Sequence, residues 1–516
     1  MWTAALLHVL SGCTVEPAAV GSPIDEVDPF IATGGPGFRV GSATPAATVP
    51  FGMVKLGPDT ALKSGGLGAL HCSGYYYTDD HIEGFSHMHM HGVGVPALGN
   101  ILFMPGDGIA DTVRHPDDWR TGFTHEDEVA TPGYYAVTLN NGIRAEMSAT
   151  KHAGHSRYTF PDSVVNPTVV IDLGYNLYGT NLGAKIRVDE TAHTVTGYMT
   201  NDDSFGGSFP IYFVAQFDTP FTSYSTWTEG EVLPGAPPDA EGGEVGAVLR
   251  FSERDVRVRV GLSLIDVASA TANLQAELAV DQAITTTASA ARADWATEFT
   301  GWEVTGGTEE EHVIFWTALY HLLQMPTQYS DADGRYVGFD GGVHQAEGRA
   351  YHSDLSLWDT YRTAHPAFDL FYPEYARDFS LSMLAMAEQG GAFPKWGVAT
   401  ADGGTRIGAP AASALSDAIV KGVTDWRVND AWALMVKQAR GEGTIPYNAR
   451  LGITEVEGMG YLPSDWYGGS VAWLQELAWA DAALAQAAVA IGDDESAAHF
   501  MWRASRYQNV YDPEQG

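Results

Sequence analysis

Four side chains suited to binding a polyhydroxylated ligand lie within five positions, inside the stretch 351–396. Trp358, Asp359, Tyr361 and Arg362 supply an indole, a carboxylate, a phenol and a guanidinium. Sugar rings have apolar faces and hydroxyl edges, so an aromatic wall and charged hydrogen-bond partners suit them. The alternative is that the rings pack in a core and that Asp359 and Arg362 form a structural ion pair, because buried ion-pair networks imitate sites.

A helix is expected to follow this cluster and to hold it in place. Pro373 and Glu374 stand near its start and Gly390 at its end, which is the usual order of helix start and stop signals. The pattern predicts a helix over 373–389. The turn after it brings Phe393 and Trp396 back toward the cluster.

The first half of the chain has the pattern of strands separated by turns. Runs rich in Val, Tyr, Thr, Phe and Ile alternate with clusters of Gly, Asn, Asp and Pro. Strands are predicted at 133–139, 144–150, 155–160, 168–173, 193–200, 210–217, 246–251 and 256–264, with a turn at 140–142. Many short strands without a helical period indicate a β-sandwich. Residues 228–243 are rich in Gly, Pro and Glu and are predicted to form a surface loop.

Residues 267–516 have a helical period instead. Alanine-rich segments at 270–278 and 288–299 are predicted to be linker helices. Thr308 and Glu311 form a capping-box pattern that begins a helix stopped by Pro326. The predicted buried face of that helix consists of Ile314, Phe315, Ala318, Leu319, Leu322 and Leu323. Further helices are predicted near 373–389, 410–421, 426–439, 470–491 and 494–507, in a succession that suggests a toroid of helix hairpins.

The composition limits the classes of partner. The chain has 516 residues, with 28 Lys and Arg against 64 Asp and Glu, so its formal net charge is −36. Such a field repels nucleic acid and anionic membrane surfaces, which favours a neutral or cationic partner. A neutral oligosaccharide meets this condition, whereas a phosphorylated glycan does not.

The first residues resemble a bacterial lipoprotein signal. Residues 1–13 are a short apolar run that ends in Leu-Ser-Gly-Cys, without a basic start. We expect export and a lipid anchor on Cys13, and we expect Cys72 to be a packing residue. The expected divisions are a leader and tether at 1–23, a β-sandwich domain at 24–266, a helical linker at 267–300 and a helical domain at 301–516.

Two clusters could bind metals. His87, His89 and His91 alternate, so an extended segment would place all three imidazoles on one face, where zinc or a similar ion could bind. The alternative is that they line a polar cleft as neutral hydrogen-bonding groups. Asp331 and Asp333 begin a pattern like a calcium loop, but the later acidic ligands are missing, and a capped turn is the more direct interpretation.

Ten ordered segments resemble motifs of the family-92 glycoside hydrolases, the bacterial exo-α-mannosidases. The segment SLWDTYR (356–362), followed by MLAMAEQGGAFPKW (383–396), is similar to the family's signature. The other segments are DPFIATGG (28–35), ATVPFGMV (47–54), LGPDT (56–60), GYYY (74–77), GFSHMH (84–89), FWTALYH (315–321), SDADGRY (330–336) and GYLP (460–463). The resemblance implies a multidomain β + α protein, with an N-terminal β-sandwich followed by an (α/α)6-barrel-type helical domain that is incomplete at its C-terminus.

The resemblance also implies a set of residues for binding the terminal mannose of an oligosaccharide or N-glycan. Asp359 is expected to accept hydrogen bonds from two hydroxyls, and Trp358 to form an apolar wall. Phe85 and His87 are expected to approach from the sandwich domain. Arg362, Glu388, Gln389 and Trp396 lie in matching motifs and are further candidates for substrate binding. The family's 1,2-linkage specialists carry a tryptophan before GYxY, and residues 60–73 contain none.

The implied reaction is hydrolysis with inversion, assisted by calcium. An inverting enzyme needs a carboxyl acid and a carboxylate base roughly 6.5–9.5 Å apart. The family carries these two groups in later motifs that have no counterpart before Gly516, so the chain resembles a C-terminally truncated homologue. No acid, base or calcium ligand is assigned, and no turnover is expected from these residues alone. The alternatives are a non-catalytic mannoside-binding protein and a non-functional fragment.

Overall fold

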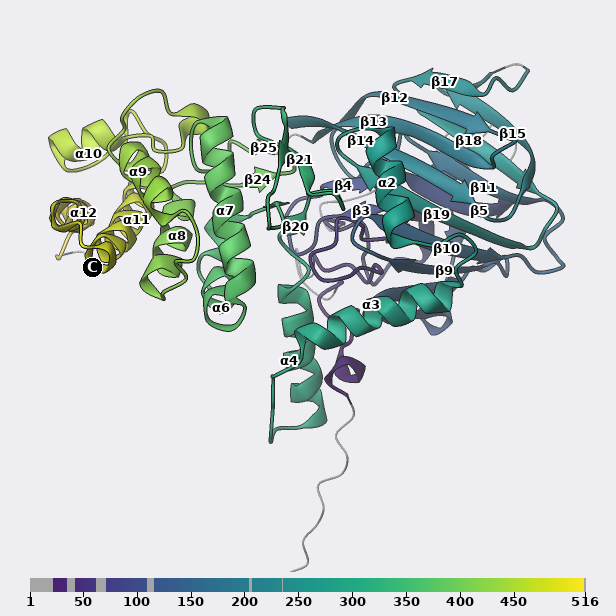
Figure 1. Cartoon of the computed structure of the whole chain (residues 1–516), viewed down its shortest axis with the longest axis horizontal. Coiled ribbons are helices and arrows are strands. Elements are labelled where there is room, and N and C mark those ends of the chain that lie inside the picture. The colour runs from purple at the N-terminus through teal and green to yellow at the C-terminus, as the bar shows by residue number, and fades with distance from the viewer. Residues whose placement is uncertain are drawn as a thin grey trace, which may run out of the picture.

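The computed structural model describes residues 22–34, 42–61, 71–108, 116–203, 207–233 and 235–514. They form a two-sheet domain at one end and a helical domain at the other (Figure 1). The predicted succession of a β-sandwich and a helical domain is therefore confirmed. Cys13 lies outside the described residues, and Cys72 is buried.

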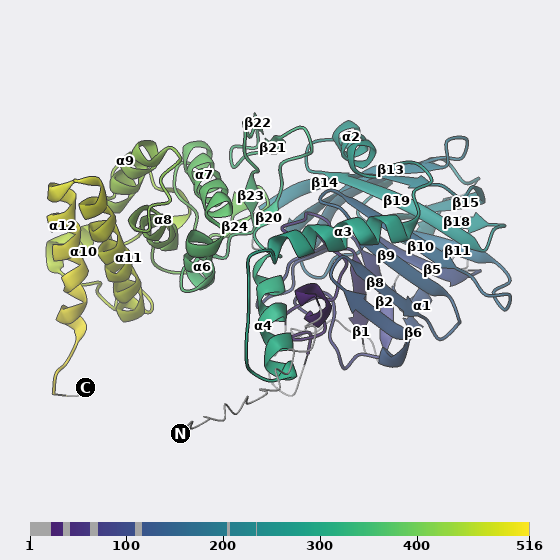
Figure 2. The same cartoon turned by 60° about the horizontal axis from the view of Figure 1, so that its bottom comes forward.

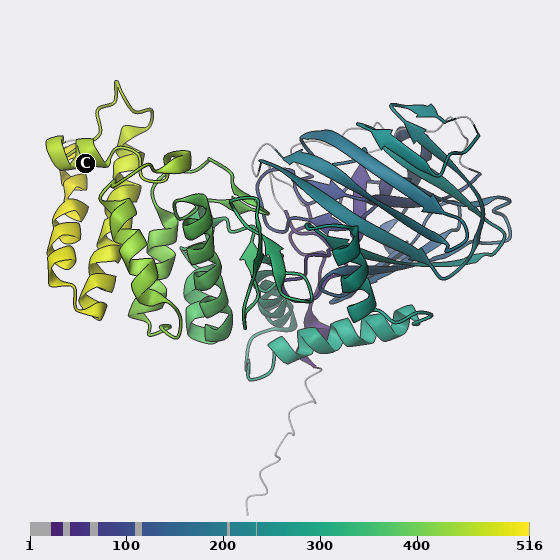
Figure 3. The same ribbon diagram turned by 45° about the horizontal axis from the view of Figure 1, so that its top comes forward.

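Two antiparallel sheets face each other in the N-terminal domain, and Figure 3 shows them as stacked layers. The first has the order β1 (Gly57–Ala61), β2 (His81–Ser86), β5 (Leu102–Asp107), β11 (Pro167–Asp172), β18 (Val245–Phe251), β15 (Phe221–Thr228) and β16 (Glu231–Val232), with β6 (Thr121–Gly122) paired to β2. The second has the order β17 (Asp239–Gly242), β12 (Thr180–Asp189), β13 (Thr194–Asp203), β14 (Gly207–Phe217), β19 (Asp255–Ser263), β10 (Ala153–Thr159), β9 (Arg144–Ala149), β8 (Tyr134–Thr138) and β7 (Glu128–Thr131). Apolar side chains from both sheets form one core.

The predicted surface loop at 228–243 is wrong. This segment contains β16 and β17, and β17 is an edge strand paired with β12. The pairing is supported by cross-strand charges, because Lys185 Nζ lies 3.1 Å from Glu241 Oε2 and Arg187 Nη1 lies 3.2 Å from Asp239 Oδ2. A strand held by charge pairs on a solvent-facing edge lacks the apolar alternation from which strands are predicted.

The helical part begins with two helices that cover the second sheet. Helix α2 (Val267–Glu277) packs on β19 and β14, and α3 (Ile284–Glu298) crosses β8, β9 and β10 (Figure 2). The remaining long helices are α4 (Glu309–Leu322), α6 (Ala364–Phe371), α7 (Pro373–Gly390), α8 (Pro410–Val420), α9 (Val428–Ala439), α11 (Ser470–Ile491) and α12 (Asp494–Ala504). Shorter ones are α1 (Pro116–Trp119), α5 (Leu357–Thr360) and α10 (Ile453–Met459). Helices α1, α5, α6 and α10 were not predicted.

The buried face of α4 differs from the predicted one. The helix buries Trp316, Leu319 and Tyr320, whereas Ile314 is 52% exposed and Ala318 is also exposed. Aromatic residues on both sides of the helix made its period ambiguous. Contacts outside the helix decide which face is buried, because Trp316 stacks on Phe299, the residue after α3, with ring centroids 5.5 Å apart. The predicted capping box is present.

Small two-stranded sheets link the helices and complete the junction between the domains. They pair β20 (Thr327–Gln328) with β23 (His352–Ser353), β21 (Arg335–Val337) with β22 (Val343–Gln345), and β24 (Gly397–Val398) with β25 (Ala401–Asp402); in the sandwich, β3 (Met88–His89) pairs with β4 (Leu98–Asn100). These short pairs lie between α7 and the sandwich (Figure 1).

One sandwich side chain penetrates the helical domain. Phe51 is fully buried, and its ring centroid lies 4.6 Å from that of Tyr375 and 5.6 Å from that of Phe379. Its backbone is bonded on both sides to the segment that follows α4: Phe51 N–H donates to Leu323 O at 2.9 Å, and Gln328 N–H donates to Phe51 O at 2.8 Å. The two domains therefore share a core at this point.

Candidate functional site

A cavity of about 280 Å³ lies between the two domains. The sandwich contributes His91, Gly92, Val93 and Gly94 to its lining. The helical domain contributes Met325, Pro326, Asp354, Leu355, Ser356, Asp359, Thr360, Ala364, His365, Phe368, Trp396 and Arg406. Clefts of this kind, with mixed apolar walls and a few polar groups at a domain interface, are typical of small-ligand sites.

The segment that carries Asp354 and Asp359 is fixed by backbone pairing and by one buried carboxylate. Strand β23 pairs with β20, and Leu355 N–H then donates to Gly397 O at 2.8 Å. Asp354 Oδ2 accepts a hydrogen bond from Tyr329 Oη at 2.8 Å, and its Oδ1 accepts one from Ala399 N–H at 3.0 Å. These contacts hold the start of α5 rigidly at the wall of the cavity.

Asp359 and Arg406 form the polar edge of the cavity. Asp359 is exposed, its Oδ2 accepts from Ser356 Oγ at 2.5 Å, and Arg406 Nε lies 3.9 Å from the same oxygen. The Arg406 guanidinium carbon lies 5.1 Å from the centroid of Trp396 and 5.9 Å from that of Trp358. A carboxylate, a guanidinium and an indole therefore surround one volume, which is the combination that a sugar ring requires.

Of the predicted residues, Asp359 and Trp396 line this cavity, while Trp358 and Arg362 lie beside it. The Arg362 guanidinium stacks on Trp358 at 4.6 Å and pairs with Glu476 Oε1 at 2.7 Å. Arg362, which follows α5, thereby faces a second, wider groove of about 820 Å³ that residues of α6, α8 and α11 also line, Trp479 among them. Part of the alternative interpretation is therefore correct, because Arg362 is in an ion pair, but its partner is Glu476.

Two other candidates lie outside the cavity. Glu388 is on the outer side of α7, where both of its oxygens accept hydrogen bonds from Arg427, at 2.7 and 3.1 Å. Gln389 Nε2 donates to Tyr336 Oη at 2.9 Å and its Oε1 accepts from Phe339 N–H at 3.3 Å, which anchors the hairpin of β21 and β22. Both residues have structural partners instead of an open face toward the cavity.

Phe85 and His87 do not reach the cavity. Both are fully buried in the sandwich, where His87 Nδ1 donates to Ile101 O at 2.7 Å and the His87 ring contacts Phe103. Burial lowers the pKa of His87 to about 4. The expected approach of these two residues is wrong because Phe85, in β2, and His87, just after β2, are both buried in the core of the sandwich. His91, from the same run, reaches the cavity instead.

The three alternating histidines do not converge on a metal. His89 is bonded to Lys55 O at 2.7 Å and to Asp59 Oδ1 at 2.8 Å, while His91 lies against His321 with ring centroids 4.7 Å apart. In the described part of the chain, no group of three or more His, Cys, Asp and Glu side chains is placed to hold a metal ion.

The sequence at 331–334 forms a turn. Gly334 N–H donates to Asp331 O at 2.8 Å, and Asp333 Oδ1 caps Arg335 N–H at 3.0 Å. This agrees with the interpretation as a capped turn. The Asp331 carboxylate, by contrast, does not cap the local backbone but bonds to Ser263 and Asn273.

The electrostatics of the cavity suit a neutral ligand. Burial lowers the pKa of His365 to about 4, and burial also holds the pKa of His91 well below its usual range, helped by the nearby His321 and Lys55. Both imidazoles are therefore neutral near pH 7. Beneath the cavity, burial lowers the pKa of Lys55 to about 8 against the opposing charge of Asp354, and burial raises the pKa of Asp354.

Several polar residues of the cavity were not predicted to line it, Arg406 and His365 among them. Arg406 stands alone in a Gly-rich loop with no motif around it, and His365 precedes a proline inside a short helix. An aromatic or charged residue isolated in a long loop was the one available signal, because loops positioned by a rigid scaffold carry many binding residues. Nothing in the local spacing connects Arg406 to Asp359.

Two family models cover nearly the whole chain. The glycosyl hydrolase family 92 N-terminal domain matches residues 26–263, and the glycosyl hydrolase family 92 catalytic domain matches residues 269–516. The chain belongs to glycosyl hydrolase family 92. The first match ends with the last residue of β19, and the second begins in the first turn of α2.

Solved members of family 92 share this fold over almost all of the chain. A family 92 α-mannosidase from Bacteroides thetaiotaomicron, in complex with mannoimidazole, superposes with a TM-score of 0.87 at 29% identity, covering 96% of this chain and 64% of that one. A family 92 inverting mannosidase from the same species gives a TM-score of 0.86 at 28% identity, with 97% and 66% covered.

A curated relative is the uncharacterized secreted glycosidase of Arthroderma benhamiae, 25% identical over 461 residues. That match covers 83% of this chain and 54% of the relative. The chain thus spans about half the length of this curated relative and about two thirds of the solved family 92 mannosidases.

The described residues do not form a calcium site at the cavity. Calcium takes 6–8 oxygen ligands. The cavity offers the carboxylates of Asp354 and Asp359, and both oxygens of Asp354 already accept hydrogen bonds from Tyr329 and Ala399. No metal ligand can be assigned to this set of donors.

Proposed function

We propose that this chain forms the sugar-binding part of an exo-acting α-mannosidase, and that the interdomain cavity holds the terminal mannose of an oligosaccharide or N-glycan. The observation that carries the proposal is the meeting of Asp359, Arg406 and Trp396 around one neutral-ligand cavity. Membership of family 92 and the mannosidase activity named for its solved relatives support it.

Each wall has a proposed role. Asp359 accepts hydrogen bonds from two adjacent hydroxyls, Arg406 donates to a third oxygen, and Trp396 covers an apolar face of the ring. Trp358 does not line the cavity and supports Arg406 from behind. His91, as a neutral imidazole, closes the cavity from the sandwich side.

For the reaction we propose hydrolysis with inversion, as in the relative whose name states it. Inversion needs an acid and a base on opposite sides of the scissile bond, far enough apart for a water molecule. We assign neither role to a residue of this chain. Calcium dependence is proposed for the whole enzyme from the family resemblance alone, and no step is derived through the ion.

Titration calorimetry with mannoimidazole tests the binding site. We expect saturable binding that weakens about 10-fold to 100-fold in Asp359→Ala, because hydrogen bonds to a charged group contribute about 1.5–3 kcal/mol. Asp340→Ala is the matched control, since Asp340 is also exposed and paired, with His344, but lies in a surface hairpin. Equal affinity in wild type and Asp359→Ala would refute the proposed site.

Release of mannose from α-1,2-mannobiose, with and without a calcium chelator, tests the activity. Chelator-sensitive release by these 516 residues would show that the acid and the base lie within them. It would overturn the proposal that these residues lack the acid and the base. Mannoimidazole binding without release would agree both with the proposal that these residues lack the acid and the base and with the non-catalytic alternative. Activity of a longer form of the protein would then refute the non-catalytic alternative.

We also infer export, with Cys13 as a lipid anchor to a bacterial periplasmic or cell surface. The relative named as secreted supports export alone. No helix in the described segments has both the length and the apolar character needed to cross a membrane. Incorporation of labelled palmitate that disappears in Cys13→Ala would support the anchor, and unlabelled protein in a lipidating host would contradict it.

A further inference from the structure

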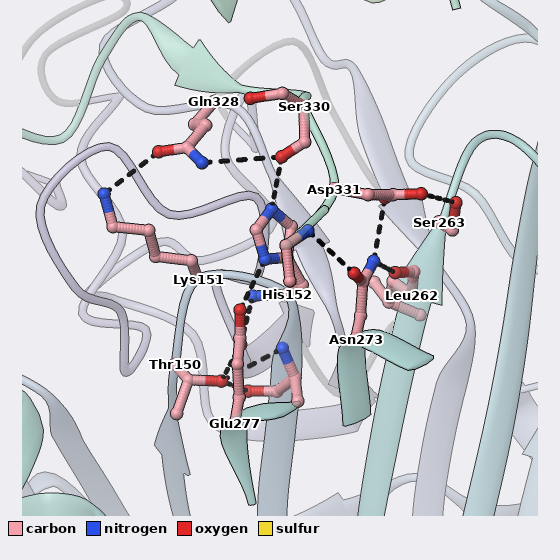
Figure 4. A network of polar contacts seen from close by, with 12 residues as sticks. Thr150, Lys151, His152, Leu262, Ser263, Asn273, Glu277, Gln328, Ser330 and Asp331 are labelled. Carbon is pink, nitrogen blue, oxygen red and sulfur yellow. Dashed lines mark hydrogen bonds and ion pairs between the residues drawn. The ribbon is translucent and has the colours of Figure 1, made fainter. Parts of the chain in front are cut away.

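One buried imidazole joins the sandwich to helix α2 and to the segment just after β20. His152 lies in the turn between β9 and β10 and is 1% exposed. Its Nε2 lies 2.7 Å from Ser330 O, just after β20, and its Nδ1 lies 2.5 Å from Glu277 Oε1 on α2 (Figure 4). A single side chain thus spans the junction.

The partners of His152 determine its proton count. A carbonyl oxygen can only accept, so Nε2 carries a hydrogen toward Ser330 O. A separation of 2.5 Å between Nδ1 and Glu277 Oε1 requires a second proton between them. Glu277 Oε2 accepts hydrogen bonds from Thr150 Oγ1 at 2.5 Å and from His152 N–H at 2.9 Å, which favours the charged carboxylate. The pair is therefore an imidazolium beside a carboxylate.

The same contacts fasten the segment after β20. Asn273 of α2 donates through Nδ2 to Asp331 Oδ1 at 2.8 Å and accepts from Ala332 N–H at 2.9 Å. Ser263 of β19 donates to Asp331 Oδ2 at 2.7 Å. Figure 4 shows these bonds converging beside His152. The segment is thus tied to the sandwich and to α2 at the same place.

The charged groups around His152 act in opposite directions. Burial alone would lower its pKa, but the hydrogen bond and the charge of Glu277, with a smaller contribution from Asp331, outweigh burial and raise it. Burial alone would raise the pKa of Glu277, and the contacts with His152 lower it. Burial raises the pKa of Asp331 against its hydrogen bonds to Ser263 and Asn273.

The neighbouring Lys151 contacts Gln328 instead of the carboxylate and carbonyl that His152 bonds. Its Nζ donates to Gln328 Oε1 at 3.0 Å. Burial lowers its pKa, opposed by the charges of Glu277 and of three carboxylates on α3 and α7: Glu298, Asp294 and Asp378. Lys151 therefore supplies a second polar tie across the same junction through Gln328, whose Nε2 lies 3.4 Å from the Ser330 O that His152 also bonds.

We propose that His152 and Glu277 form a proton-dependent clamp between the sandwich and the helical domain. With two ring protons, His152 donates to Glu277 and to Ser330 O at once. After one proton leaves to solvent, the neutral ring keeps a single N–H and can satisfy one of these acceptors. The lost contact leaves either Glu277 Oε1 without its donor or Ser330 O with only the long bond from Gln328 Nε2 at 3.4 Å, which weakens the attachment of the segment after β20.

The sign of the pH dependence follows from the direction of each pKa. The stabilisation from His152 is fully present below its ordinary pKa near 6.5 and is lost as pH rises through the raised folded value. The stabilisation from Glu277 is present above its ordinary value near 4.5 and is lost as pH falls through the lowered one. The clamp is closed between these limits and opens on the alkaline side.

The clamp holds one wall of the cavity. The segment it fastens continues backward through β20 to Met325 and Pro326, and β20 pairs with β23, which leads directly to Asp354. Opening the clamp removes one of the bonds between this wall and the sandwich that carries His91, while the bonds from Gln328 N–H to Phe51 O and from Ser263 to Asp331 remain. Any effect on mannoside binding rests on the proposed function, whereas the clamp itself does not.

Hydrogen exchange measured by mass spectrometry on the whole chain tests the clamp. After correction for the intrinsic rate, protection of peptides covering 327–332 is expected to fall about 10-fold to 100-fold as pH rises past the clamp's pKa, the worth of one hydrogen bond to a charged group. Glu277→Gln keeps the shape and removes the charge, so it should abolish this step. His344→Gln, which breaks a surface histidine–carboxylate pair, should leave it unchanged.

Two results would overturn the proposal: a wild-type protection that is independent of pH between 6 and 10, or a step that persists in Glu277→Gln. If the variant does not fold, nitrogen-15 shifts of His152 in the wild type decide, because a raised pKa requires most of the rings to carry two ring protons at pH 6.5, where an ordinary imidazole is half protonated. Mannoimidazole affinity is measured separately. A pH-dependent loss of protection in a protein that does not bind mannoimidazole would refute the proposed function alone. Mannoimidazole binding by a protein whose protection does not change with pH would refute the clamp alone.

Discussion

Replacing Phe51 by alanine should separate the two domains more effectively than any other single truncation. The ring is fully buried among side chains of α6 and α7, with Phe368, Tyr375 and Phe379 all within 5.9 Å between centroids. Phe51 itself belongs to the sandwich, so the packing energy that it supplies is energy of the junction. Its removal leaves a void directly behind Phe368, which lines the cavity.

The size of the effect follows from the burial. Truncation of a buried Phe to Ala costs about 3–5 kcal/mol through lost transfer energy and the residual void. The backbone at Phe51 has φ of 56°, in the left-handed region that favours glycine. In ordinary extended or helical backbone, glycine is less stable than alanine, but here Phe51→Gly should be at least as stable as Phe51→Ala.

Differential scanning calorimetry and urea unfolding provide the assay. We expect Phe51→Ala to split unfolding into two transitions, with the helical domain melting first, and mannoimidazole affinity to fall. Phe85→Ala, a fully buried sandwich phenylalanine, is the control that should lower the stability of the sandwich without splitting the transition. A loss below about 1 kcal/mol, or a single unchanged transition, would refute the reasoning that Phe51 unites the two cores.

Three further variants test other parts of the fold. Burial raises the pKa of Glu83 to about 7, so the free energy of unfolding should fall as pH rises from about 4.5 to 7. Glu83→Gln should remove this loss and raise the free energy of unfolding by about 1–3 kcal/mol at pH 8, and an unfolding free energy in the variant that still falls steeply over this range would contradict the prediction. Asp481→Asn should cost about 3–5 kcal/mol in urea unfolding, because Arg503 bonds both oxygens of this buried carboxylate at 2.7 Å and Arg450 shares it; a neutral result would show that water replaces the charge. Thr308→Ala should cost about 1 kcal/mol by removing a bond from Glu311 N–H, and helix content unchanged on thermal melting would contradict the cap.

Local patterns predicted the fold well where an element buries one face. The strands around 134–159 were predicted from their residue types and from the Asn-Asn-Gly turn between two of them, and most of their residues are buried. The predicted helices at 373–389 and 470–491 carry start and stop residues that do not depend on tertiary contacts. Edge strand β17 and the face of α4 failed because cross-strand charges and a neighbouring helix decided them.

The candidate site was predictable only in part. Asp359 and Trp396 were found because a motif marks them, and the cavity confirms their proximity to each other. Arg406 and His91 were assigned no such role, since only the folded chain brings them to Asp359. His87 was misplaced for the opposite reason: the motif was right, but this side chain is buried in the sandwich against Ile101 and Phe103. The spacing of residues in the sequence does not show whether a side chain in the loop after a strand points into the core or into the cavity.

The shared core at Phe51 has a consequence for synthesis on the ribosome. Phe51 is made 328 residues before Phe379, its partner in α7. At about 5–20 residues per second, the ring waits roughly 16–66 s for its pocket to emerge. The nascent sandwich must therefore carry an exposed aromatic ring throughout that interval, which makes this chain a natural client for a holding chaperone, and substitution of Phe51 should shorten that association as it weakens the finished molecule.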